Sequence, residues 1–283
     1  MAQAVAPVEP VWGTVTLSDG FVIESSTWGT GPNWFVFVHG LCSDPAITAR
    51  ALSFWANEHD ATIFALQLPN HGGSDDVRTF EEMVRRVVEW ADFQGLSKVP
   101  WVGHSLGGII SLAVAVTRPD LVSHLITVCS PTGRDYEAMT LLDVQLRLWI
   151  VAMDVLLSAY LASLQAVCSL DPYGFVGAMF GMLLKPPRIR GSAEILLGAQ
   201  RMLATAVQVV DTYGIPQTRY WAVLDITVRP PRRGHNLPGS DVQLLSSHCM
   251  PFFMYPIRHI SGELTRAFGT ASAPLRETQM QAA

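Results

Sequence analysis

Short apolar runs alternate with longer stretches of helical periodicity through the first half of this chain, and this order constrains the fold most strongly. The runs at 34–38, 61–66, 99–102 and 121–128 have the length and composition of strands buried on both faces. Helical patterns at 79–94 and 106–118 lie between the later runs. Parallel strands need such crossover connections, so this order predicts a mostly parallel sheet flanked by helices.

The remaining segments complete the predicted architecture. Two short strands at 12–17 and 21–27, joined by a tight turn, are expected to open the chain as a hairpin. Two more strands are expected at 220–224 and 242–247. Residues 131–215 show only helical apolar patterns broken by prolines, which predicts a helical cap inserted after the sixth strand. We therefore expect one α/β domain over residues 1–283 that contains this cap.

Charge and composition limit the kinds of molecule that this chain is expected to bind. The net charge is −5 and no long basic run occurs, so nothing indicates binding to nucleic acid, and a small molecule is the expected partner. The four cysteines lack metal-binding or redox spacing and are expected to be reduced thiols. With no export leader in the N-terminal sequence, a cytoplasmic location is the default.

One apolar stretch raises the question of a membrane. Residues 149–168 contain Asp154 as their only charged residue and approach the length that spans a bilayer. A central aspartate would cost about 2.5–3.5 kcal/mol on insertion scales, so a buried cap helix is the preferred interpretation over contact with a membrane.

The motif that carries chemistry is GHSLG at 103–107, between a buried strand and a helix pattern. A serine on a sharp strand-to-helix turn is pushed out of the sheet, and the helix N-terminus beneath it favours negative charge. Ser105 is therefore the predicted nucleophile. The backbone N–H groups of Leu41 and Leu106 are the predicted oxyanion hole, and Gly40 permits the turn that aims one of them.

Four segments together carry a resemblance to a known family: VFVHG at 36–40, LPNHGGS at 68–74, GHSLGG at 103–108 and HCMP at 248–251. In this succession the chain resembles the α/β hydrolase superfamily over about 250 residues. The resemblance implies an α/β hydrolase fold with a catalytic triad. One departure is that Gln67–Asn70 stands where the family commonly carries an acidic residue before its Gly-rich loop.

The base and the acid of the triad follow from positions near the C-terminus. His248 comes after the last predicted strand and is the predicted base, whereas His259 is expected inside the terminal helix. The family usually has an acid after the strand before last, which favours Asp225. Asp241 would leave too few residues before His248 for a crossover and a parallel strand. The acid stays open among Asp225, Asp135, Asp211 and Asp241, or none of them.

The leading hypothesis is a serine hydrolase that cleaves an ester, thioester or lactone of a small hydrophobic substrate through an acyl-enzyme, without metal or cofactor. The predicted substrate-binding residues are His39, His104, Trp149 and Tyr160.

Two alternatives stay open. HGLCSD at 39–44 and DTYGIP at 211–216 are similar to cofactor-free quinaldine-type dioxygenases of the same fold, although this chain has Cys129 and Ser130 where those enzymes carry an acid. The second alternative is a hydrolase fold that binds a ligand without catalysis.

Overall fold

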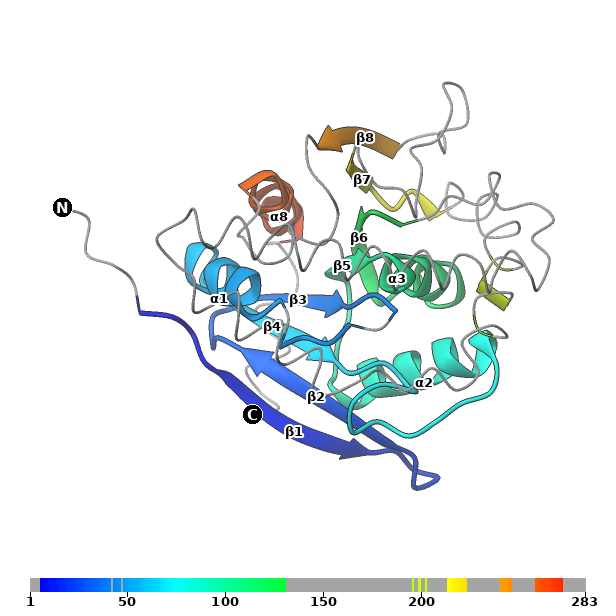
Figure 1. The fold of residues 1–283 in the computed structure, drawn as a ribbon. Coiled ribbons are helices and arrows are strands. Elements are labelled where there is room, and N and C mark those ends of the chain that lie inside the picture. The colour runs from blue at the N-terminus through cyan, green and yellow to red at the C-terminus, as the bar shows by residue number, and fades with distance from the viewer. Residues whose placement is uncertain are drawn as a thin grey trace, which may run out of the picture.

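Eight strands form a single sheet in the order β1-β2-β4-β3-β5-β6-β7-β8 (Figure 1). The computed structural model describes residues 6–41, 43–46, 48–130, 195, 198–199, 202, 213–222, 240–245 and 258–271. The strands are β1 (Pro10–Thr16), β2 (Val22–Trp28), β3 (Asn33–Val38), β4 (Ala61–Leu66), β5 (Val99–His104), β6 (Val122–Val128), β7 (Gln217–Ala222) and β8 (Ser240–Leu245).

Strand directions agree with the sequence pattern. β1 and β2 form an antiparallel hairpin, and β2 pairs antiparallel with β4. Every other pair of neighbouring strands is parallel: β4 with β3, β3 with β5, β5 with β6, β6 with β7, and β7 with β8. The predicted mostly parallel sheet is therefore confirmed. All carboxyl ends of its parallel strands lie along one edge, where loops from different strands can meet.

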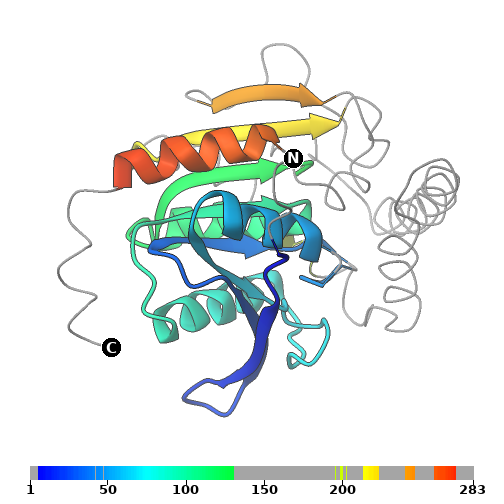
Figure 2. The ribbon, with the colours of Figure 1, turned by 90° about the vertical axis from the view of Figure 1, so that its left-hand side faces the viewer.

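Helices cover both faces of the sheet. They are α1 (Ala49–Glu58), α2 (Phe80–Phe93), α3 (Leu106–Thr117) and α8 (Arg258–Ala271). α1 and α8 lie on one face, whereas α2 and α3 lie on the other (Figures 1 and 2).

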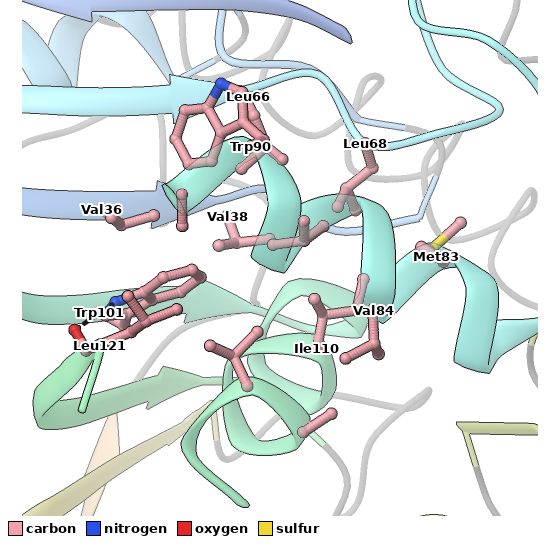
Figure 3. Close-up of a cluster of buried hydrophobic side chains, with 14 of the residues drawn as sticks. Val36, Val38, Leu66, Leu68, Met83, Val84, Trp90, Trp101, Ile110 and Leu121 are labelled. Atoms are coloured by element: carbon pink, nitrogen blue, oxygen red, sulfur yellow. Dashed lines mark hydrogen bonds between the residues drawn. The ribbon is translucent and has the colours of Figure 1, made fainter. Parts of the chain in front are cut away.

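Alternate residues of one strand enter two separate cores, which explains why the strands are continuously apolar. Val36 and Val38 of β3 pack with Trp90 of α2 and Ile110 of α3 (Figure 3). Phe35 and Phe37 of the same strand pack in a second cluster with residues from α1 and α8, including Trp55 and Leu264.

The start of α2 shows how local sequence sets an element. Thr79 caps the helix, because its Oγ1 accepts a hydrogen bond of 3.1 Å from the backbone N–H of Glu82. The Glu82 carboxylate accepts a weak return bond of 3.4 Å from the N–H of Arg78, one residue earlier than in the usual reciprocal arrangement. This helix start was predicted from Thr79 and Glu82, and it is confirmed.

The predicted cap at 131–215 lies largely outside the described residues and stays a prediction. Its described members include Ile195 and Ala199, which are helical and buried in the cluster that contains Phe80. Residues 149–168 also lie outside the described part, and no helix within that part is long and apolar enough to cross a membrane. Cys129 is disulfide-bonded, so the expectation that all four cysteines are free thiols is wrong for this residue.

Candidate active site

Ser105 occupies the turn between β5 and α3 with φ 50° and ψ −117°. A positive φ is costly for a residue with a side chain, and such conformations persist where the surroundings enforce them. The side chain is partly exposed, although its neighbours His104 and Leu106 are buried. The turn places Ser105 at the carboxyl edge of the sheet, and its role as the nucleophile stays a prediction.

The flanking glycines allow this turn because backbone passes where a side chain would lie. A Cβ on Gly107 would stand 2.2 Å from the carbonyl oxygen of Val38, and a Cβ on Gly103 would stand 2.5 Å from that of Gly107. Glycine at these positions lets α3 begin directly against the end of β3 and brings Ser105 beside the loop that follows β3.

Hydrogen bonds hold both ends of the Ser105 backbone. Its N–H donates to the Val128 carbonyl at 2.9 Å, which ties the turn to the end of β6. Its carbonyl accepts from the N–H of Gly108 at 3.0 Å and from the hydroxyl of Ser130 at 2.9 Å. The turn is therefore fixed by the neighbouring strand and by its own helix.

The predicted oxyanion loop lies against the nucleophile. A Cβ placed on Gly40 would come 3.1 Å from the Ser105 Cβ and 2.9 Å from Nδ1 of His104. The Gly40 carbonyl accepts a hydrogen bond from the N–H of Ser43 at 3.2 Å. Within the described residues, neither the N–H of Leu41 nor that of Leu106 donates to a protein acceptor. One of these N–H groups follows Gly40 in the loop that lies against Ser105, and the other belongs to the residue after Ser105, which is compatible with the predicted oxyanion hole.

The buried side chain of His39 holds the predicted oxyanion loop in place through hydrogen bonds to backbone groups. Its ring is completely buried, and Nε2 accepts a hydrogen bond of 2.9 Å from the N–H of Leu68. Nδ1 therefore carries the proton and donates to the Gly40 carbonyl at 2.8 Å. Burial, and then the neighbouring His71, hold the pKa of His39 well below its usual value. Because backbone groups occupy both ring nitrogens, this arrangement favours a bracing role over the predicted contact with substrate.

Two further histidines are buried: His71, which contacts His39, and His104, which directly precedes Ser105. The ring of His71 contacts that of His39 edge to face at 4.9 Å, and its Nδ1 lies 3.0 Å from the Pro69 carbonyl. Burial lowers the pKa of His71, and it lowers the pKa of His104 to about 3. His104 is only 7% exposed, which leaves little surface for the predicted contact with substrate. Sequence reasoning missed His71, although its place in the Gly-rich loop was a usable signal.

Other side chains order the Gly-rich loop, in which Gln67 and its neighbours replace the family's acidic residue. The Asn70 side-chain oxygen accepts a bond of 2.6 Å from the N–H of Val77. The Glu24 carboxylate, from β2, accepts one of 2.8 Å from the N–H of Gly73. The side-chain amide oxygen of Asn70, within the loop, and the carboxylate of Glu24, from β2, thus accept hydrogen bonds that fix this loop.

Several predicted site residues lie outside the described part of the chain: His248, Asp225, Trp149, Tyr160, Asp135 and Asp211. In sequence, Asp225 follows the end of β7 by three residues and His248 follows the end of β8 by three. Asp241 is the second residue of β8, which runs parallel to β7. It therefore lies at the edge opposite Ser105, and this argues against Asp241 as the acid. His259 lies in α8, as predicted.

Comparison with known proteins also indicates the α/β hydrolase fold. A sequence model of the alpha/beta hydrolase fold family matches residues 33–155. A protein of Mycobacterium phage D29 that is named among the non-heme haloperoxidases is 31% identical over 126 residues, 44% of this chain and 45% of that protein. A pimeloyl-[acyl-carrier protein] methyl ester esterase of Aliivibrio fischeri is 36% identical over 107 residues, 37% of this chain and 38% of that protein. The chain thus matches less than half the length of these relatives.

Solved structures extend the likeness to nearly the whole chain. The thioesterase domain from the curacin biosynthetic pathway has a TM-score of 0.67 at 14% identity, covering 91% of this chain and 99% of that domain. A thermophilic esterase from Thermogutta terrifontis has a TM-score of 0.64 at 16% identity, covering 94% and 100%. The sheet order and the turn at Ser105 therefore define a protein with the α/β hydrolase fold. Residues 33–155 match the α/β hydrolase fold family, and the chain as a whole has that fold.

Proposed function

We propose that the protein is a serine hydrolase that cleaves an ester or thioester of a small hydrophobic acyl group, or a lactone. The observation that carries this proposal is the strained turn at Ser105 with the free N–H groups of Leu41 and Leu106 beside it. Such a pair of donors stabilises the oxyanion of acyl transfer. The names of two relatives, a methyl ester esterase and a thioesterase domain, support the substrate class.

The proposed mechanism has two steps. His248 accepts the proton of the Ser105 hydroxyl as its oxygen attacks the substrate carbonyl, and the N–H groups of Leu41 and Leu106 bind the developing oxyanion. The alcohol or thiol leaves with that proton, and an acyl-enzyme remains on Ser105. Water, activated by His248, then attacks the acyl-enzyme and releases the acid. Asp225 is the proposed partner that orients the His248 ring.

The position of the two partners in the chain supports this assignment. Asp225 and His248 each follow by three residues a strand that runs parallel to β5, the strand that ends just before Ser105. Loops after neighbouring parallel strands share one edge of the sheet, so this order brings a base and an acid toward the nucleophile's edge. Chain order Ser, Asp, His is also the order of α/β hydrolases.

The test is the turnover of p-nitrophenyl esters of increasing acyl length by the protein and by single-site variants. Ser105→Ala and His248→Ala are expected to lower kcat by at least about 10³-fold, since each removes a member of the reacting group. Asp225→Asn is expected to lower it by about 10³–10⁴-fold, whereas the matched control Asp241→Asn is expected to stay near the wild-type rate. Labelling of Ser105 by an organophosphorus reagent checks the nucleophile directly.

Two results would replace this proposal. Oxygen uptake on a hydroxyquinolone that survives Ser105→Ala and fails in His248→Ala would establish a cofactor-free oxygenase. A folded protein that neither turns over esters nor takes the organophosphorus label would instead be a ligand-binding member of the superfamily.

A further inference from the structure

We infer that Ser130 is a positioning residue that aims one of the two proposed oxyanion donors. This inference rests on the proposed hydrolase function. Ser130 follows the end of β6 by two residues, and its side chain is buried, with 5% exposure. Its hydroxyl donates to the carbonyl of Ser105 at 2.9 Å, and the Val128 carbonyl lies 3.5 Å from the same hydroxyl. Ser130 therefore contacts the back of the nucleophile's own peptide group.

The geometry of a peptide links that contact to the reaction. The Ser105 carbonyl and the Leu106 N–H belong to one planar trans unit, since the described residues contain no cis peptide bond. In such a unit the carbonyl and the N–H point in opposite directions. A donor that fixes the carbonyl therefore also fixes the direction of the Leu106 N–H, which is the proposed oxyanion donor.

The unit needs an external support because its backbone is strained. Ser105 has φ 50° and ψ −117°, a conformation that is unfavourable for a residue with a side chain. The helix supplies donors to its carbonyl from Gly108 at 3.0 Å and Ile109 at 3.4 Å. Ser130 adds a donor that is attached to the sheet, so it fixes the peptide relative to the oxyanion loop after β3. Hydrogen bonding to the carbonyl also polarises the N–H of the same peptide.

Packing holds the Ser130 hydroxyl in this position. A Cβ on Gly108 would stand 1.8 Å from the Ser130 Oγ and 2.7 Å from its Cβ. The first turn of α3 therefore closes directly over Ser130, and glycine at 108 is what admits it. The Ser130 side chain therefore packs directly against the backbone of Gly108.

The chain offers a matched control in Ser111. This residue is also buried, and its hydroxyl donates to the carbonyl of Gly107 at 2.7 Å, within α3. Ser111→Ala removes a buried hydroxyl and a bond to a helix carbonyl, as Ser130→Ala does, but it leaves the Ser105 peptide untouched.

The experiment compares Ser130→Ala, Ser130→Cys and Ser111→Ala in ester hydrolysis, in affinity for an aryl trifluoromethyl ketone, and in thermal unfolding. We expect Ser130→Ala to lower kcat about tenfold with KM unchanged, because a donor used only in the transition state is misaligned. Affinity for the ketone, which forms an oxyanion on Ser105, should fall by the same factor. Ser130→Cys fills the space with a weak donor and should behave like the alanine variant. Ser111→Ala should keep the wild-type kcat.

Three results would overturn the inference: equal kcat values in Ser130→Ala and Ser111→Ala, a full wild-type rate in Ser130→Cys, or a loss confined to KM. The cysteine variant keeps the inference testable if the alanine variant does not fold. Labelling of wild-type Ser105 tests the proposed function separately, because it does not depend on how the rate responds at Ser130.

Discussion

At the scale of single residues, the strained backbone of Ser105 affects the stability of the protein independently of the proposed catalytic role of its hydroxyl. The residue holds a positive φ of 50°, where a Cβ is unfavourable and glycine is not. Its backbone N–H and carbonyl are nevertheless both hydrogen-bonded, to Val128 and to Gly108 and Ser130. The strain is thus confined to the torsion angles, and the bonds around them enforce it.

We therefore expect two inactive variants of this residue to differ in stability. Ser105→Gly relieves the strain, whereas Ser105→Ala keeps a Cβ at the same φ. The glycine variant should be more stable than the alanine variant by about 1 kcal/mol, after the extra entropy of glycine in the unfolded chain is subtracted. Urea unfolding of both proteins measures the difference. A glycine variant that is less stable than the alanine variant would show that the turn stores no strain.

At the scale of elements, the sequence predicted those whose signals are local. The continuous apolar runs marked β3, β4, β5 and β6 because each is buried on both faces. Thr79 and Glu82 marked the start of α2. The pattern gave no bounds for α1, whose first described turn carries no acidic residue and whose Thr48 makes no side-chain cap bond. A helix without cap signals depends on tertiary packing, here of Leu52 and Trp55 on the sheet.

The candidate site, like the fold, could be predicted from the sequence only where its signals are local. Ser105 followed from its glycines and from its place between a strand and a helix. The roles of His39 and Ser130 could not be predicted from the sequence, because each depends on a contact between segments far apart in the chain. His39 contacts Leu68, and Ser130 contacts Ser105. No local spacing encodes such contacts, and the parallel pairing of β3 with β4 and of β5 with β6 brings them together.

The junction of β3 and α3 gives a prediction at this scale. Gly107→Ala would place a Cβ 2.2 Å from the Val38 carbonyl and 2.5 Å from that of His39, so strand and helix would have to separate. We expect a loss of stability of about 1–3 kcal/mol, as for overpacked cores. The control is Gly262→Ala in α8, where a Cβ meets nothing within 4 Å and should stabilise the helix by up to about 1 kcal/mol. Equal denaturation midpoints for both variants would contradict this assignment.

At the scale of the whole molecule, three histidines that are buried in the described part of the chain make folding sensitive to acid. His39, His71 and His104 come from loops or strand ends after β3, β4 and β5, and burial lowers the pKa of each below 6.5. The unfolded chain therefore binds more protons than the folded protein below about pH 6.5. The stability that these neutral histidines contribute is fully present above that pH. It is lost as the pH falls toward their pKa values in the folded protein, and the pKa of His104 there is about 3.

For His104, whose folded pKa is about 3, the expected slope is about 1.4 kcal/mol per pH unit between roughly pH 6 and pH 5, and the lowered pKa values of His39 and His71 add to it in the same direction. Urea unfolding across pH 5 to 7.5 measures it. His104→Gln removes one titrating group, so its stability should fall less steeply, by about one proton's share. An unchanged slope in this variant would mean that His104 is protonated in the folded protein.

The two proposed oxyanion donors, on Leu41 and Leu106, are main-chain groups. Replacing either leucine by another residue other than proline leaves its N–H in place. Selection can therefore alter the side chain of Leu41, which is only partly buried, and reshape the surface that a substrate meets. The proposed charge stabilisation depends on the backbone alone, so changes of side chain can alter substrate preference without altering the proposed chemistry.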